Sequence, residues 1–234
     1  MESILEIIKG VNPVRLTTLA RVKRELKITS TADDDVLQRK IEEASSDIQG
    51  AMGYRLPSED VKETFWHSNA GEIFHSFRGW DAHPSGRDDV LFLKRTPIRA
   101  ISKVTVDDDV IFDALDPSTA ASIRFDAGAG LLYRVGTSGY PCPWWFCKSI
   151  VTEYTGGFIL PGSDDCDLEP GIEGATIALL QSYWASRGRD ALIKREDIPD
   201  VRTVEYWVGA VGDPKLLPPR VLASLSQFER PAYA

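Results

Sequence analysis

The chain has 234 residues, enough for one large domain or for a small helical domain that carries an inserted β-module. Hydrophobic residues make up 43% and charged residues 26%, which excludes a disordered or collagen-like chain. With Lys+Arg 27 against Asp+Glu 35 the net charge is −8, and without a long basic run this excludes a surface that grips nucleic-acid phosphates tightly.

The first ten residues mix apolar and charged side chains. The apolar residues are Ile4, Leu5, Ile7 and Ile8, and the charged ones are Glu2, Glu6 and Lys9; neither a basic segment nor a small-residue cleavage site accompanies them. Nowhere does an apolar run approach the roughly 20 residues of a membrane-spanning helix. We therefore expect no signal peptide, no membrane association, and a soluble protein that is made inside the cell.

Two amphipathic helices are predicted next. In residues 16–27 the apolar side chains recur at spacings of three and four, behind Thr17 or Thr18 as N-cap. Thr31 can cap the second helix, and three aspartates, 33–35, favour the macrodipole in its first turn. Its buried stripe is expected to be Leu37, Ile41, Ala44, Ile48 and Ala51. Gly53 would close this helix in the left-handed conformation.

The pattern changes to strands between about residue 61 and residue 158. Short β-branched and aromatic runs alternate there with Gly, Pro and Asp clusters. The predicted strands are 61–66, 72–77, 90–93, 100–106, 122–125, 131–135 and 149–154. Residues 104–112 read as a hairpin with a polar tip. We expect these strands to form a compact antiparallel module.

Helix returns after Pro170 and is expected to stop near Gly188. Its apolar stripe contains Ile172, Thr176, Leu179, Leu180, Tyr183 and Trp184. Residues 189–200 look loose, 201–208 look like a strand, and Pro218-Pro219 introduces a last short helix with Val221, Leu222, Leu225 and Phe228 on one side.

The predicted fold class is therefore α+β. It consists of a small α-helical bundle, built from the N-terminal and C-terminal helices, with an inserted antiparallel β-module. The expected segments are 1–58 for the N-terminal helices, 59–160 for the β-module, and 161–234 for the C-terminal helices and tail.

The histidines His67, His75 and His83 and three cysteines invite a metal interpretation. Zinc ligands usually come in pairs at short spacing, such as C-x2-C, and no such pair occurs. Cys142 and Cys147 are separated by Pro-Trp-Trp-Phe, which favours packing. We expect no metal site, and we expect all three cysteines, with Cys166, to be reduced thiols.

Two aspartate runs, 33–35 and 107–109, resemble carboxylate clusters for Mg²⁺ or Ca²⁺. Local structure explains both, because one lies in a first helical turn and the other at a hairpin tip. The sequence also contains no D-x-D-x-D-G loop, P-loop, dinucleotide fingerprint or G-x-S-x-G elbow. We therefore predict a protein that is not an enzyme, with no catalytic residues and no cofactors.

Aromatic residues cluster near the end of the β-module. They are Tyr140, Trp144, Trp145 and Phe146, followed by Tyr154 and Phe158. Such a cluster can be a platform for sugars or nucleic-acid bases, but it more often belongs to a core or a subunit interface.

The order of these features resembles the head-tail connector, or adaptor, family of tailed bacteriophages and gene-transfer particles. Residues 16–26, 33–37 and 41–44 look like its opening helices, and 96–106 like the proline-led strand of its longer members. Residues 151–158 resemble the strand before its third main helix. The chain departs from the family at 141–145, where longer members have Trp-Pro, and at 67–89, which look like an insertion.

The resemblance implies a structural virion protein at the head-tail junction, made in the host cytoplasm. It would form a homo-oligomeric ring, a dodecamer, that docks on the portal protein and meets a stopper or tail-completion protein. DNA would pass through the centre without sequence-specific binding. The acidic charge would suit the wall of that channel.

The C-terminal segment is unusually apolar, and the hypothesis is that it contacts the portal. The residues assigned to this interface are Tyr206, Trp207, Leu216, Leu217, Leu222, Phe228 and Tyr233. Ordinary packing of a terminal helix is the competing interpretation.

Three alternatives stay open at this point. The chain could be another tail-completion or baseplate protein. It could be a small hydrolase or metal enzyme whose site is assembled from distant residues. It could also be a carbohydrate- or nucleic-acid-binding module that uses Trp144 and Trp145.

Overall fold

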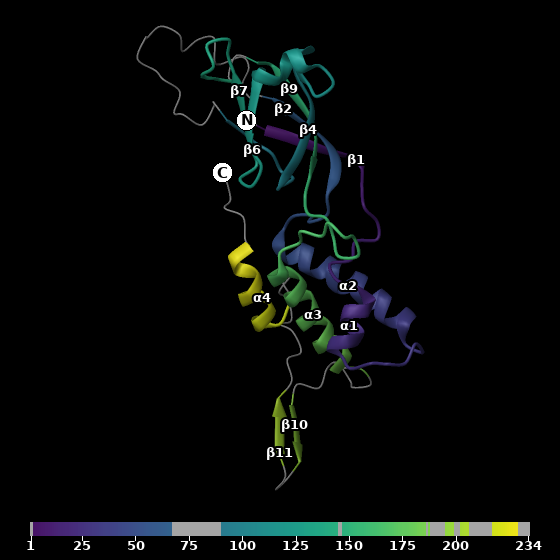
Figure 1. The fold of residues 1–234 in the computed structure, drawn as a ribbon. Coiled ribbons are helices and arrows are strands. Elements are labelled where there is room, and N and C mark those ends of the chain that lie inside the picture. Colours follow the sequence, from purple (N-terminus) through teal and green to yellow (C-terminus); the bar gives the residue numbers. More distant parts are fainter. Residues whose placement is uncertain are drawn as a thin grey trace. The chain divides into compact units, whose positions relative to one another are not determined.

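The computed structural model describes residues 2–66, 90–144, 147–185, 187, 195–198, 202–205 and 217–228. The protein is mixed α+β with antiparallel sheets, as predicted (Figure 1). The chain folds into two compact units. Met1–Val11 and Leu56–Phe158 form the β unit, and Asn12–Arg55 and Ile159–Ala234 form the helical unit.

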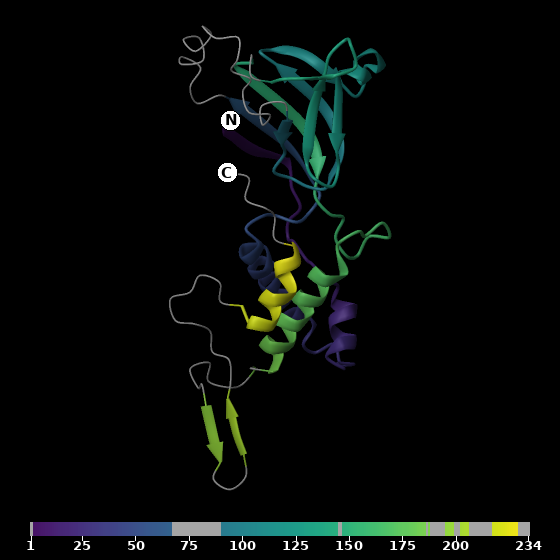
Figure 2. The same cartoon turned by 90° about the vertical axis from the view of Figure 1, so that its left-hand side faces the viewer.

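The β unit contains two antiparallel sheets (Figures 1 and 2). The first has the order β1-β2-β9-β4-β5, with bounds Glu2–Lys9, Glu59–Trp66, Ser149–Gly156, Ile98–Val106 and Asp109–Asp113. The second has the order β3-β7-β6, with bounds Val90–Phe92, Leu131–Val135 and Ile123–Asp126; β8, Pro141–Cys142, pairs with β7. A 3₁₀-helix, η2 (Pro117–Ser122), follows β5.

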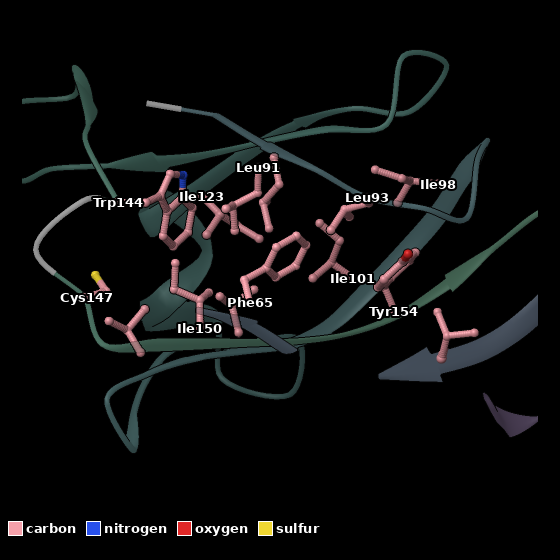
Figure 3. Packing of buried hydrophobic residues seen from close by; sticks show 14 residues of the cluster. Phe65, Leu91, Leu93, Ile98, Ile101, Ile123, Trp144, Cys147, Ile150 and Tyr154 are labelled. Atoms are coloured by element: carbon pink, nitrogen blue, oxygen red, sulfur yellow. The ribbon is translucent and has the colours of Figure 1, made fainter. Parts of the chain in front are cut away.

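The core of the β unit draws side chains from both sheets (Figure 3). Alternate residues of β2 and β9 are buried, as expected for strands that turn one face inward. Trp144 and Tyr154 are fully buried, so the core interpretation of the aromatic cluster is confirmed for both. Tyr140 is 75% exposed, and Trp145 and Phe146 lie outside the described residues.

The predicted hairpin with a polar tip is formed by β4 and β5. Asp107 and Asp108 have φ of 48° and 73°, the left-handed values that a tight two-residue hairpin turn requires. The Asp107 carboxylate accepts the backbone N–H groups of Lys148 at 2.7 Å and Ser149 at 2.9 Å. These two bonds explain why an aspartate occupies this turn.

The helical unit contains α1 (Leu19–Glu25), α2 (Asp34–Met52), α3 (Pro170–Ala185), α4 (Pro219–Leu225) and the 3₁₀-helix η3 (Ser226–Phe228). Thr18 caps α1, and Gly53 ends α2 with φ of 74°, both as predicted. The prediction that Thr31 caps α2 was wrong. The Asp34 N–H bonds the Thr31 carbonyl in a turn, so the helix begins later, behind Asp33.

Residues far apart in the sequence hold the helical unit together. The Thr17 hydroxyl donates to Glu173 at 3.0 Å, and the Tyr183 hydroxyl donates to Asp47 at 2.6 Å. The predicted stripe of α2 is buried at Leu37, Ile41, Ala44 and Ile48, whereas Ala51 is half-buried. Within the described part of the chain, no helix is both long and apolar enough to cross a membrane.

Three of the strands in the described residues were not predicted from the sequence. Residues assigned to the segment of N-terminal helices form β1, which pairs with β2. Arg195–Ile198 forms β10 inside a stretch that looked loose, and pairs with β11 (Arg202–Glu205), which matches part of the predicted strand 201–208. The third is the two-residue β8. The predicted strand 72–77 lies outside the described residues.

Candidate functional site

Two glutamates are buried inside the β unit. Glu59 and Glu63 lie four residues apart on the inward face of β2 and are 1% and 0% exposed. Nη2 of Arg95 lies 3.3 Å from Oε2 of Glu59, and the Val11 backbone N–H donates to Oε1 of Glu59 at 3.3 Å. Burial of an isolated carboxylate is costly, so these partners are what make Glu59 tolerable there.

The surroundings of Glu63 are also well defined. Its Oε1 accepts the Ser3 hydroxyl at 2.7 Å, and its Oε2 accepts the Tyr154 hydroxyl at 2.9 Å and the Lys94 N–H at 3.0 Å. Burial raises the pKa of Glu63, and burial together with the Glu63 carboxylate raises the pKa of Tyr154. The carboxylate is enclosed and fully bonded to protein groups, which suits a structural role better than proton transfer to a substrate.

The residues considered as metal ligands are not brought together. Among the described residues no group of three His, Cys, Asp or Glu side chains could hold a metal ion. His67, His75 and His83 lie outside the described residues. Cys142, Cys147 and Cys166 are all free thiols, and burial raises the pKa of Cys147.

The aspartate runs have local roles. Asp33 pairs with Arg187 at 2.9 Å and Asp34 with Lys23 at 2.7 Å, while Asp107 binds backbone N–H groups at the hairpin tip.

The predicted portal-contact residues fall into two groups. Tyr206, Trp207, Leu216 and Tyr233 lie outside the described residues. Leu217 is 4% exposed, beside the buried Val221 and Leu225 of α4, whereas Leu222 and Phe228 are half-buried. The Phe228 carbonyl accepts the Tyr54 hydroxyl at 3.1 Å. In this structure Leu217 therefore belongs to the packing of the helical unit.

A groove of about 270 Å³ opens between α1, α2 and α3. Its lining consists of Leu26, Val36, Leu37, Lys40, Leu180, Tyr183, Trp184 and Arg187. Nζ of Lys40 lies 5.4 Å from the centre of the Tyr183 ring, and the guanidinium of Arg187 lies 4.6 Å from the centre of the Trp184 ring. These distances are within the range of cation–π interactions, which position both cations at the rim of an otherwise apolar groove.

The groove could not be predicted from the sequence, because it forms only where three helices meet. The one available signal was the pair of aromatic residues at the end of the α3 stripe, where burial is incomplete.

Strand β1 carries an unusual number of exposed aliphatic side chains. Ile4 is 62% exposed, Ile8 59% and Ile7 40%, and Val11, just after the strand, is 38% exposed. Strand β1 is an edge strand of its sheet. The exposed side chains therefore lie beside backbone N–H and C=O groups that face outward from the sheet edge. The sequence shows both apolar and charged side chains here, and no strand was predicted from them.

Comparison with known proteins gives one family and several partial structural likenesses. No curated protein matches the chain. The neck of an empty gene transfer agent particle, computed with C6 symmetry, is similar with a TM-score of 0.48 and 17% identity over 81% of this chain and 88% of that chain. A chain of the native gene transfer agent virion is similar with a TM-score of 0.46 and 18% identity over 84% and 89% of the two chains.

The family match concerns the segment that forms α1, α2 and β2. Residues 16–76 match the model of the phage gp6-like head-tail connector protein family. This segment includes the opening helices on which the resemblance was based. Over residues 16–76 the chain is therefore similar to the phage gp6-like head-tail connector family, the family that its sequence resembles.

Proposed function

We propose that this protein is a structural subunit of the head-tail junction of a phage-like particle. It joins the portal to a stopper or tail as a ring through which DNA passes. The single observation that carries this proposal is the family match over residues 16–76. The enclosed Glu63 carboxylate and the packed Trp144 have roles within the fold of the β unit.

In this proposal the helices form the body of the ring as a small bundle, and the β unit decorates it. The contacts among α1, α2 and α3 support such a body, because they bury a continuous apolar stripe. The net charge of −8 would let DNA slide past the channel wall without sticking. The ring is expected to be a dodecamer whose neighbours meet through two different surfaces of each subunit.

The proposal is tested by mixing the purified full chain with the portal of the same particle. Native mass spectrometry and electron microscopy should show a ring of copies of this chain on the portal. The chain alone can remain monomeric, so its state in isolation decides nothing. A mixture in which portal and chain stay separate at high concentration would contradict the proposal.

The proposed portal contact of the C-terminal segment requires a careful truncation. Deleting residues 216–234 would remove the buried Leu217, Val221 and Leu225, so a loss of binding could reflect unfolding. A chain ending at Phe228 keeps α4 and η3 and removes Tyr233. We expect it to retain its thermal unfolding transition and to bind the portal more weakly. Unchanged binding would remove Tyr233 from the interface.

Tyr206 and Trp207 lie too far from the end of the segment to be tested by this truncation, so they need substitution instead. A Tyr206→Ala, Trp207→Ala double variant should weaken portal binding, and the exposed Tyr140→Ala is the matched control.

A further inference from the structure

The helical groove is an apolar depression with an exposed entrance. Leu37 and Leu180 are buried at its base, whereas Leu26 and Val36 are half-buried on its walls. A groove of about 270 Å³ is large enough to hold several waters. Water beside such a lining gains little from hydrogen bonding, so an apolar side chain would displace it favourably.

Strand β1 offers a matching projection. Ile4 lies opposite Thr64 in the pairing of β1 with β2, on the other face of the sheet from Ser3 and Leu5. The Ser3 hydroxyl donates to Glu63, and Leu5 packs against the hydrophobic core. The register shifts between Ile7 and Lys9, so Ile8 is the extra residue of a bulge, a device that re-aims a side chain. An edge strand with exposed aliphatic residues is a site for association unless something covers it.

We propose that Ile4 on β1 of one copy enters the groove of α1, α2 and α3 on a neighbouring copy of this chain. A projection and a complementary pocket at different places on one chain generate a head-to-tail contact, which closes into a ring when the rotation closes. This inference rests on the proposed function, because a ring requires such a pair of different surfaces. Ile8 extends the contact beyond the groove.

Charge is compatible with this occupant. Glu2 and Glu6 lie on the same face of β1 as Ile4, one on each side, while Lys40 and Arg187 stand at the rim of the groove. Both cations already have exposed partners, Lys40 with Glu43 at 2.6 Å and Arg187 with Asp33 at 2.9 Å.

Docking would exchange one set of exposed ion pairs for another. Such an exchange orients partners more than it adds affinity. The insertion of the apolar side chain therefore supplies most of the binding.

Two single substitutions and their mixture test the contact. Ile4→Lys removes the projection, and Val36→Arg fills the groove; each should raise the concentration of chain needed to form rings on the portal by at least about tenfold. Mixed together in the presence of the portal, the two variants should form one-to-one pairs and no closed ring. In each pair the intact strand of one variant meets the intact groove of the other. Sedimentation equilibrium and native mass spectrometry measure these species.

The matched control is Leu115→Lys, an aliphatic residue that is 93% exposed in the β unit and away from β1. Circular dichroism melts must show that all three variants fold. If Ile4→Lys forms rings on the portal as readily as Leu115→Lys does, this inference is wrong although the proposed function stands. If the wild-type chain never associates with the portal, the proposed function itself fails.

A crosslink identifies the partner directly. In a Cys142→Ser, Cys166→Ser background, Ile4→Cys combined with Val36→Cys should give disulfide-linked dimers and higher species under oxidation. A link within a single chain, seen as a faster-migrating monomer without reduction, would overturn the proposal. So would a link formed only with the portal.

Discussion

The hydroxyl of Tyr154 donates a hydrogen bond to Oε2 of Glu63 at 2.9 Å, and both side chains are almost completely enclosed. The same hydroxyl accepts the Arg95 backbone N–H at 3.0 Å. One atom therefore joins β9, β2 and the loop before β4. Through Ser3, the carboxylate extends the connection to β1.

Replacing Tyr154 with Phe removes this hydroxyl, so the Glu63 carboxylate and the Arg95 backbone N–H each lose a hydrogen bond. We expect the free energy of unfolding to fall by about 1–3 kcal/mol, the cost of leaving buried polar groups unsatisfied. Urea denaturation monitored by tryptophan fluorescence measures the change. Tyr140→Phe at an exposed position should change it by less than about 0.5 kcal/mol. Equal values for the two variants would show that the Tyr154 hydroxyl contributes nothing.

The stability of the protein should depend on pH through Glu63. Burial raises its pKa in the folded state, so the folded chain holds this proton at pH values where the unfolded chain has lost it. Its contribution to the free energy of unfolding is complete below about pH 4.5, the ordinary pKa of Glu. That contribution is lost as the pH rises through the folded-state pKa. With rising pH, the wild type should therefore lose stability relative to Glu63→Gln, which has no titrating group at this position.

Denaturant titrations at a series of pH values measure this difference. Glu6→Gln, an exposed change on β1, serves as the control and should keep the wild-type slope. A constant difference between wild type and Glu63→Gln at all pH values would contradict the assignment.

Trp144 separates a packing role from a binding role. Because its side chain is fully buried, Trp144→Ala should destabilise the protein by about 3–5 kcal/mol. Thermal melts followed by far-UV circular dichroism provide the measurement, with Tyr140→Ala as an exposed aromatic control. A Trp144→Ala protein of normal stability that has lost affinity for a sugar or nucleic acid would instead support the ligand-binding alternative.

Gly157 is expected to tolerate no side chain. Its φ of 112° is rarely adopted by other residues, and a Cβ there would collide with the Pro57 carbonyl oxygen. Gly157→Ala should lower the melting temperature and cost about 1–3 kcal/mol. Gly174 in α3 has open space around its Cα, so Gly174→Ala should stabilise by about 0.4–1 kcal/mol. A stable Gly157→Ala protein would mean that this turn can rearrange.

The sequence predicted the helices well because their signals are local. Thr18, Gly53 and Pro170 mark helix boundaries by their own conformational preferences, and the α2 stripe follows the helical period. Most described strands of the β unit were predicted for the same reason. The exception at β1 is instructive, because Glu2, Glu6 and Lys9 interrupt the alternation and only pairing with β2 makes the segment a strand.

The surfaces were less predictable than the elements. The groove exists only where Leu26, Val36 and Trp184 approach one another from three helices, and no spacing in the sequence encodes that approach. In the same way Glu59 and Arg95 are ordinary surface residue types until the fold encloses them. Burial of polar residues is a tertiary property, so periodicity alone could not reveal it.

Neither unit is made from one continuous stretch of chain, and this affects synthesis. Strand β1 is translated before α1 and α2, and β2, its pairing partner, only after them. The apolar stripe of α2 in turn waits for α3, which follows the whole β unit. At about 5–20 residues per second, that wait is on the order of ten seconds. During this interval the stripe that contains Leu37 and Ile41 lacks the α3 side chains that pack against α2 in the folded unit.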